Sequence, residues 1–178
     1  MKLRDKLSIA LYCMLFHPLL ICPLTPKIIK RTIIRNIPKT VICSPYGLFL
    51  CRAGTDDIDC IRPDYEIGLK VYFKELRSGV FIDVGAHIGL YTVMVAKNLR
   101  RGLVIAIEPD VRNYVSLCKH VKINRLEERV VALNVAAFSK NTQIKLYLSE
   151  ESPCRHSIIK RGDRKHLIVK ARTLDSVL

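Results

Sequence analysis

Residues 80–93, VFIDVGAHIGLYTV, place one carboxylate and two glycines directly after an apolar run. Asp83, Gly85 and Gly89 form the pattern D-x-G-x-x-x-G. Glycines at such a turn let the backbone bend tightly and let a ligand approach it, and a helix that follows offers unpaired N–H groups. The pattern therefore indicates a ligand-binding turn. The alternative interpretation is an ordinary turn between a strand and a helix, which uses glycine without any ligand.

Glu108 is a second candidate carboxylate, because it stands near the end of the next apolar run, LVIAIEP (103–109). A carboxylate at the end of the second strand of a nucleotide-binding unit can accept hydrogen bonds from both ribose hydroxyls. This position favours a cofactor that contains a nucleoside, either NAD or S-adenosylmethionine. The alternative role for Glu108 is a charge near the N-terminal end of a helix dipole.

The glycine spacing distinguishes these two cofactors. Dinucleotide-binding turns require G-x-G-x-x-G, whereas this chain has His87 at the position of the middle glycine. The spacing disfavours a nicotinamide-dependent oxidoreductase. The pattern D-x-G-x-x-x-G instead resembles the first motif of class I S-adenosylmethionine-dependent methyltransferases, and this resemblance implies S-adenosylmethionine as the cofactor. His87 lies inside the turn itself, where a backbone contact suits it better than the role of a general base.

The elements around these residues predict an α/β fold. Apolar strand patterns at 80–85, 103–109 and 129–137 alternate with amphipathic helical patterns. Such alternation predicts βαβ units and a Rossmann-like doubly wound parallel sheet with helices on both faces. Ligands of these sheets bind beyond the carboxyl ends of the strands, where the turn at 83–89 lies.

Two further elements are predicted before this unit. Two β-rich runs separated by turn residues predict a hairpin over residues 39–52. Residues 62–76 then predict a helix that Asp64 can cap and that Ser78–Gly79 ends.

The rhythm changes after the third strand. Residues 142–150 and 166–172 read as two strands joined by a basic loop, which predicts an antiparallel pair. The cations of this loop are Arg155, Lys160, Arg161, Arg164 and Lys165. They fit a solvated surface loop, and they also fit a contact with an anionic acceptor or RNA.

Composition limits the class of protein. The chain has 178 residues, of which 49% are hydrophobic and 26% charged, as expected for one globular domain. Its net charge of +14 indicates an anionic partner or a generally basic composition. There is no Trp and no basic stripe interleaved with aromatic residues, so specific nucleic-acid binding has little support.

The seven cysteines indicate a reducing compartment and predict a cytoplasmic protein. None forms a C-x-x-C pair or lies near histidine at zinc-finger spacing, so no metal site is expected. One exception to the thiol interpretation is Cys43 with Cys51, which could face each other across the predicted hairpin.

The organisation predicted for the chain has three parts. Residues 1–38 form an apolar and basic N-terminal segment, 39–78 a hairpin and helix, and 79–178 a cofactor-binding domain. The apolar run at 7–24 is flanked by Lys and Arg on both sides. A docking helix or interfacial segment, a membrane anchor and a signal peptide all remain open for it, and the first alternative includes association with a membrane surface.

A resemblance to a known family adds to this interpretation. FIDVGAHIGLYT, VIAIEPDVRNYVSLCKHVKIN, LNVAAFS and RTLDSVL, in this order over residues 60–178, resemble the motifs of the FkbM family of methyltransferases. The resemblance implies methyl transfer from S-adenosylmethionine to a hydroxyl of a sugar or another small metabolite. It implies no particular catalytic residue.

The resemblance also implies a set of cofactor-binding residues. The methionine end of the cofactor would lie at Asp83, Gly85, Ala86, His87 and Gly89, the ribose at Glu108, and the adenosine beside Pro109, Asp110, Asn134, Val135 and Ala136.

The chain departs from the family after TLD, where the family continues with more sheet. We therefore expect an incomplete sheet with an exposed edge at its first strand, which could be covered by a partner or a second copy of the chain. An inactive cofactor-binding fragment is the main alternative to an active methyltransferase.

Overall fold

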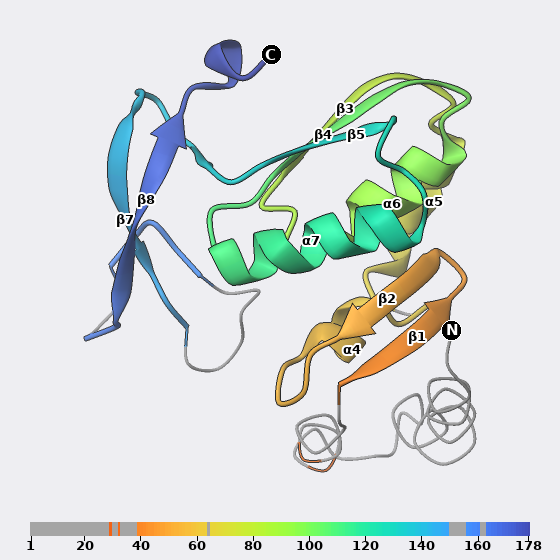
Figure 1. Ribbon diagram of the computed structural model, residues 1–178, viewed down its shortest axis with the longest axis horizontal. Helices are drawn as coiled ribbons and strands as arrows, with labels where there is room; N and C mark the ends of the chain where they lie inside the picture. Colours follow the sequence, from red (N-terminus) through yellow and green to blue (C-terminus); the bar gives the residue numbers. More distant parts are fainter. Residues whose placement is uncertain (1–28, 30–31, 33–38, 64, 150–155, 161–162) are drawn as a thin grey trace. The chain divides into compact units, whose positions relative to one another are not determined.

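The computed structural model describes residues 29, 32, 39–63, 65–149, 156–160 and 163–178, which form two compact units divided after Gly68 (Figure 1). The apolar run at 7–24, for which a docking helix is one alternative, and the predicted cap Asp64 lie outside the described residues. No helix among the described residues is both long enough and apolar enough to cross a membrane.

The first unit contains the predicted hairpin. Strands β1 (Thr40–Ser44) and β2 (Gly47–Cys51) pair antiparallel. The register places Cys43 opposite Leu48 and Cys51 opposite Thr40. The suggestion that Cys43 and Cys51 face each other is therefore wrong, because they belong to different residue pairs and alternate onto opposite faces of the hairpin.

A buried ion pair closes the loop after this hairpin. The carboxylate of Asp57, at the start of α4 (Asp57–Cys60), is fully buried. Its Oδ1 accepts from Arg52 Nη2 at 2.7 Å, while Oδ2 accepts from Arg52 Nε at 2.8 Å and from the Arg52 N–H at 2.9 Å. This forked geometry satisfies a charge that would otherwise be costly to bury.

The second unit is built on a parallel sheet. Strands β3 (Ser78–Val84), β4 (Arg101–Ile107) and β5 (Val130–Leu133) lie side by side in that order. Helix α6 (Leu90–Asn98) connects β3 to β4, and α7 (Val111–Ile123) connects β4 to β5. The predicted α/β, Rossmann-like fold is confirmed by this βαβαβ arrangement.

The described helices of this unit lie on one face of the sheet (Figure 1). Right-handed crossovers that step twice in the same direction place both connecting helices on the same side. Helix α5 (Ile67–Glu75) joins them, because the ring of Phe73 packs edge-on against Phe81 of β3 and Tyr91 of α6. Helices were predicted on both faces of the sheet, but the described residues place none on the second face.

The structure differs from our prediction at the third strand and agrees with it at the end of the chain. The predicted strand 129–137 stops at Leu133, and Ala136–Ala137 forms a short strand, β6, in a separate sheet. In that sheet β6 pairs parallel to β8 (His166–Arg172), and β7 (Thr142–Tyr147) pairs antiparallel to β8. The predicted antiparallel pair is thus confirmed. A 3-10 turn, Leu174–Ser176, follows it.

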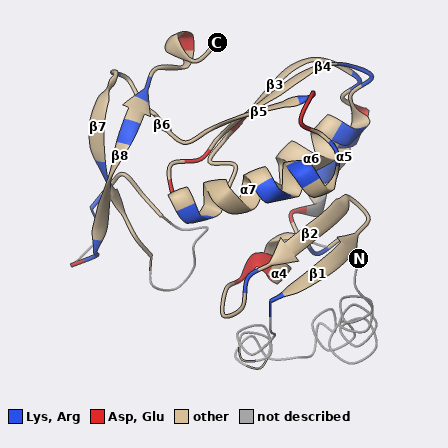
Figure 2. Ribbon diagram, viewed as in Figure 1, with Lys and Arg blue, Asp and Glu red and all other residues tan. Residues whose placement is uncertain are grey.

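Lys and Arg are distributed over many elements rather than along one (Figure 2). They occur on α5, α6, α7, β7 and β8 of the second unit. The net positive charge is therefore spread widely over this unit, with one local concentration at the β7–β8 hairpin.

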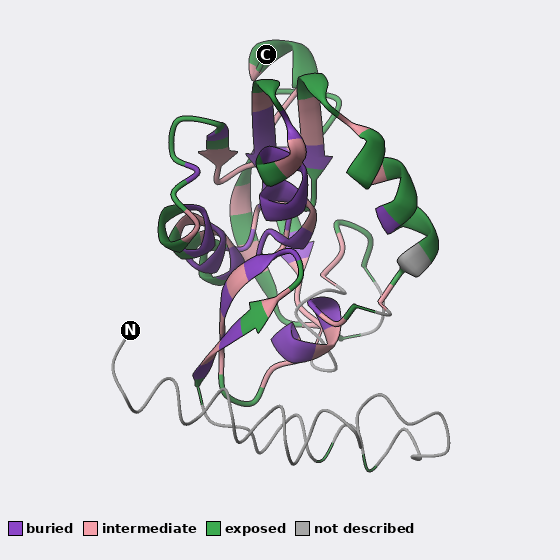
Figure 3. Ribbon diagram, turned by 90° about the vertical axis from the view of Figure 1, so that its right-hand side faces the viewer, coloured by how far each residue is buried: buried purple, intermediate pink, exposed green. Residues whose placement is uncertain are grey.

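The core of the second unit centres on α6 and β4 (Figure 3). Six residues of α6 are buried: Leu90, Thr92, Val93, Met94, Val95 and Ala96. On β4 all residues from Val104 to Ile107 are buried. Helix α5 is largely exposed by contrast, with Tyr72 74% accessible.

The face of the parallel sheet opposite these helices is apolar except at the starts of β3 and β4, where the alternation places Ser78 and Arg101. Alternation and register place the following side chains on it, and we call it the open face: Val80, Ile82, Val84, Leu103, Ile105, Ile107, Val131 and Leu133. Val80 and Val84 on the edge strand β3 are 63% and 55% exposed. The expected exposed edge is present, since β3 pairs only with β4 among the described strands.

We expect the open face to cause self-association. The double variant Val80→Lys/Val84→Lys should sediment with a smaller weight-average mass and bind less of a hydrophobic dye, because charges interrupt the apolar surface. Its free energy of unfolding should change by no more than about 0.5 kcal/mol, as for other exposed positions. As a matched contrast, Ile105→Lys on the same face should unfold the protein, because Ile105 is 7% exposed. Unchanged sedimentation and dye binding in the double variant would contradict this expectation.

Candidate functional site

The predicted site residues converge at the carboxyl ends of the parallel strands. Asp83 is near the end of β3, Glu108 directly follows β4, and Asn134 directly follows β5. Because these strands pair in the order β3, β4, β5, the three ends are adjacent along one edge of the sheet. The turn from Gly85 to Gly89 begins at this edge and leads into α6.

The turn is held by its own backbone hydrogen bonds. The N–H groups of Gly85 and Ala86 both donate to the carbonyl of Ile107, at 2.9 and 3.0 Å, and Gly89 donates to Ala86 at 2.7 Å. The N–H of His87 donates to Glu108 Oε2 at 2.8 Å. These N–H groups are therefore engaged within the protein and do not form an open cradle for phosphate.

Backbone conformation explains the glycines. Gly85 and Gly89 have φ values of 78° and 88°, a region that favours glycine. A Cβ at Gly89 would lie 2.5 Å from Leu117 Cδ1 of α7, so this glycine allows the two helices to pack. A Cβ at Gly85 would meet no atom within 4 Å, which leaves open space above the turn. His87 also has a positive φ of 51°, which costs about 1–2 kcal/mol for an L-residue.

Glu108 joins the two turns that begin at β3 and β4. Its Oε2 accepts from His87, and its Oε1 accepts from the N–H of Asp110 at 2.9 Å. Burial raises the pKa of Glu108, and the N–H groups of Asp110 and His87 oppose that effect. Each carboxylate oxygen has a second lone pair, so Glu108 can still accept hydroxyl hydrogens from a ligand.

Asp83 is a second buried carboxylate at the same edge. Its Oδ2 accepts a hydrogen bond of 2.5 Å from the hydroxyl of Thr92, a fully buried residue of α6. Burial raises the pKa of Asp83, while the hydrogen bonds from Thr92 oppose the rise. Two carboxyl groups in so dry a place favour a ligand that brings positive charge.

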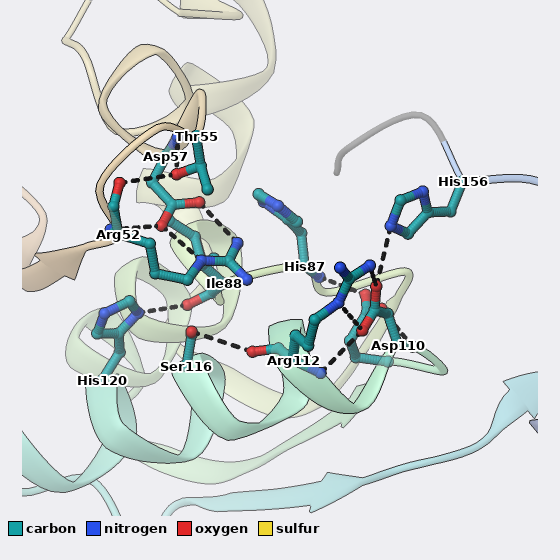
Figure 4. A network of polar contacts seen from close by, with 11 residues as sticks. Arg52, Thr55, Asp57, His87, Ile88, Asp110, Arg112, Ser116, His120 and His156 are labelled. Atoms are coloured by element: carbon teal, nitrogen blue, oxygen red, sulfur yellow. Dashed lines mark hydrogen bonds and ion pairs between the residues drawn. The ribbon is translucent and has the colours of Figure 1, made fainter. Parts of the chain in front are cut away.

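Asp110 has a structural role in addition to its place near the site. Its Oδ1 caps α7 by accepting from the N–H of Arg112 at 2.8 Å, and its Oδ2 accepts from Arg112 Nη2 at 2.8 Å (Figure 4). His156 Nε2 lies 2.9 Å from the same Oδ2. Burial disfavours the charged form of Asp110, but the hydrogen bonds from His156 and Arg112 prevail and lower its pKa.

His156 connects this edge to the β7–β8 hairpin. Its Nδ1 accepts the N–H of Ser149 at 3.0 Å, so its Nε2, which lies near Asp110, carries the proton. The side chain is only 8% exposed. A residue distant in the sequence therefore holds the segment after β7 against the end of β4.

His120 of α7 supports the turn through a hydrogen bond to its backbone. It is fully buried on α7, and its Nδ1 lies 2.6 Å from the carbonyl of Ile88 (Figure 4). Because a carbonyl oxygen only accepts, Nδ1 carries the proton here. This hydrogen bond fixes the carbonyl between His87 and Gly89.

The residues after β5 were predicted to contact the adenosine, and one of them, Asn134, supports the backbone at the end of β4. The side-chain amide of Asn134 donates to the carbonyls of Glu108 at 2.8 Å and of Pro109 at 3.1 Å. It thereby turns the chain away from the parallel sheet, which explains why the predicted third strand stops at Leu133. Val135 follows, and Ala136 is buried where β6 pairs with β8. Their assignment to the adenosine stays a prediction.

The structure thus brings together the carboxylates, the glycine turn and Asn134, as the sequence predicted for their neighbourhood. Sequence analysis missed Thr92, His120 and His156, which hold Asp83, Ile88 and Asp110. Thr92 and His120 occupy positions on amphipathic helices where an apolar residue is expected. A polar residue at such a position could have indicated a buried hydrogen bond. His156 gives no such signal, because it lies in a basic loop.

Comparisons with known proteins show partial similarity. No family model matches the chain, and no curated protein matches it. A structure of M. jannaschii TYW2 in complex with AdoMet has 26% identity and a TM-score of 0.44 over 53% of this chain and 42% of that chain. P. horikoshii TYW2 in complex with MeSAdo has 20% identity and a TM-score of 0.46 over 58% and 39%.

A structure of the methyltransferase FkbM from Methylobacillus flagellatus KT has 17% identity and a TM-score of 0.38 over 59% of this chain and 23% of that chain. The chain spans less than half the length of each of these three structures. The specific FkbM resemblance stays a prediction.

The raised pKa of Asp83 predicts a pH-dependent effect of Asp83→Asn. The folded protein holds the Asp83 proton more tightly than the unfolded chain, so the wild type loses stability as the pH rises from about 4 through the raised pKa. Asparagine does not ionise. The free energy of unfolding of Asp83→Asn relative to wild type, measured with urea, should therefore increase over this range and then become constant.

Asp110→Asn is the control with the opposite sign. Its pKa is lowered, so the wild type loses the contribution of Asp110 as the pH falls below about 4, and the deficit of the variant should shrink there. A pH-independent difference between Asp83→Asn and wild type from pH 4 to 8 would show that the Asp83 pKa is not raised.

We expect His156→Ala to destabilise the protein by about 1–3 kcal/mol, because the N–H of Ser149 loses its acceptor and Asp110 loses a donor. Hydrogen exchange at the Ser149 amide should accelerate more than exchange in β4. His156→Gln, which can still donate to Asp110, should recover part of the loss. His166→Ala, at an exposed histidine, is the matched control. Equal stabilities of His156→Ala and His166→Ala would contradict this role.

Proposed function

We propose that this edge of the sheet binds S-adenosylmethionine and that the protein is a methyltransferase of the FkbM type, acting on a hydroxyl of a sugar or another small metabolite. One observation carries the proposal. The glycine turn offers open space and two buried carboxylates, Asp83 and Glu108, while its N–H groups at Gly85, Ala86, His87 and Gly89 are already engaged.

This combination disfavours a dinucleotide. A pyrophosphate at such a turn is bound by free backbone N–H groups and needs a glycine where this chain has His87. The N–H of His87 instead donates to Glu108, so an anion at that point would meet a carboxylate. S-adenosylmethionine has no phosphate and carries a positive sulfonium, which suits the charge of the site.

Each residue has a defined role in this proposal. Glu108 accepts hydrogen bonds from the ribose hydroxyls, and Asp83 faces the positively charged methionine end. Gly85 leaves room for close approach, since even a Cβ at this position would meet no atom within 4 Å. We assign the contacts with the adenosine to Pro109, Val135 and Ala136.

Bound S-adenosylmethionine would supply an electrophilic methyl group. The protein would contribute chiefly by position, since the acceptor oxygen must lie in line with the methyl carbon and the sulfur, and positioning accounts for several kcal/mol of a barrier. The buried carboxylates are held by Thr92, His87 and Asp110 before any ligand arrives. Little reorganisation is then required on binding.

Titration calorimetry on the full chain tests the cofactor. We expect binding of S-adenosylmethionine and of its demethylated product, and no binding of NAD. Glu108→Ala should weaken binding by about 1.5–3 kcal/mol, the range for hydrogen bonds to a charged group. Gly85→Val should abolish it, because the side chain enters the open space and φ is unfavourable for valine.

Glu127→Ala is the matched control, since Glu127 is exposed and follows the end of α7. It should leave the affinity unchanged. Binding of NAD without binding of S-adenosylmethionine would refute the proposed cofactor. Methyl transfer from labelled S-adenosylmethionine to a panel of sugars and metabolites then tests the activity separately.

A further inference from the structure

A hollow of about 290 Å³ lies at the β7–β8 hairpin. Lys145 and Tyr147 of β7 and His166 of β8 line one side of it, and residues of the segment between the strands line the rest. Tyr147 lies directly opposite His166 in the register, and their ring centroids are 5.8 Å apart. Lys145, two residues before Tyr147, projects from the same face of β7.

The wall of the hollow is fixed by backbone hydrogen bonds. Tyr147 exchanges both of its backbone hydrogen bonds with Ser157, at 2.8 and 3.0 Å, and the N–H of Leu148 donates to the carbonyl of Lys165 at 2.8 Å. These contacts hold parts of the connecting segment beside the strands. Among the charged residues of the lining, Lys165 is therefore fixed at its backbone carbonyl.

The lining is strongly basic. Lys145, Lys160, Arg164 and Lys165 carry four positive charges against one negative charge on Asp163, which gives a formal charge of +3. Figure 2 shows Lys and Arg on this hairpin, and Arg164 is half-buried whereas the lysines are exposed. A partly buried guanidinium offers a rigid fork of donors that matches the oxygens of a phosphoryl group.

We propose that this hollow binds the phosphoryl group of a small phosphomonoester whose ring packs on Tyr147 and His166. The cations bind the phosphoryl oxygens, and the two rings provide an apolar wall with a polar edge. This site goes beyond the proposed function, because S-adenosylmethionine has no phosphate and brings positive charge. The hollow therefore serves a different ligand from the glycine turn.

Calorimetry with three probes at constant ionic strength tests this proposal on the full chain. Phenyl phosphate has both a ring and a phosphoryl group, inorganic phosphate has only the second, and phenol has only the first. We expect phenyl phosphate to bind more tightly than phosphate, and phenol not to bind. Tyr147→Leu should weaken binding of phenyl phosphate while leaving that of phosphate unchanged.

Charge variants then locate the site. Arg164→Gln should weaken binding of both phosphates about tenfold, as expected for loss of a charge-assisted hydrogen bond. Asp163→Asn should strengthen binding, because it removes the one negative charge of the lining. Lys170→Gln is the matched control, since Lys170 is an exposed cation of β8 outside the lining. It should change nothing.

Three outcomes would overturn the proposal. One is the absence of phenyl phosphate binding. Another is an equal effect of Lys170→Gln and Arg164→Gln, which would mean diffuse attraction to a basic surface. The third is tighter binding of a single-stranded oligonucleotide that Arg164→Gln abolishes, which would assign the surface to nucleic acid. Should Arg164→Gln fail to fold, Lys145→Gln replaces it with the same expected direction.

Discussion

The carboxylate of Glu108 is the interaction on which the site depends. One oxygen accepts the N–H of His87 from the turn after β3, and the other accepts the N–H of Asp110 from the turn after β4. A single side chain therefore sets the spacing between two consecutive strand-to-helix turns. It also stabilises His87 in a left-handed conformation that would otherwise be unfavourable. This carboxylate adds to the bonds that the N–H groups of Gly85 and Ala86 make to the carbonyl of Ile107 at the end of β4.

Burial gives the carboxylates their chemical character. A charged group removed from water is costly unless hydrogen bonds or opposite charges compensate it. Asp110 receives both kinds of compensation from Arg112 and His156, and its pKa is lowered. Asp83 and Glu108 are supported mainly by neutral donors, so burial prevails and their pKa values are raised. A cationic ligand would supply what these two groups lack.

The sequence predicted the parts of this structure that depend on local pattern. Alternation of apolar strands and amphipathic helices located β3, β4, α6 and α7, and turn chemistry located the hairpin of the first unit. It could not predict contacts between distant residues. Asn134 looked like part of a continuous strand, yet its amide bonds the backbone of the β4 end and stops the strand. His156 lies in a segment whose pattern indicates only a basic loop, because its partner Asp110 is set by the tertiary fold alone.

Hydrogen bonds between residues distant in the sequence also determine which backbone groups of the turn a ligand could reach. Most β-to-α turns attract anions, because the first N–H groups of a helix lack partners. Here the turn satisfies four of its N–H groups internally, two of them on the single carbonyl of Ile107. The carbonyl of Ile88 is likewise held by His120. These four N–H groups are therefore not free to bind an anion, and two buried carboxylates lie beside them. Under the proposed cofactor assignment, selectivity against a phosphate-bearing ligand would come from the same hydrogen bonds that shape the turn.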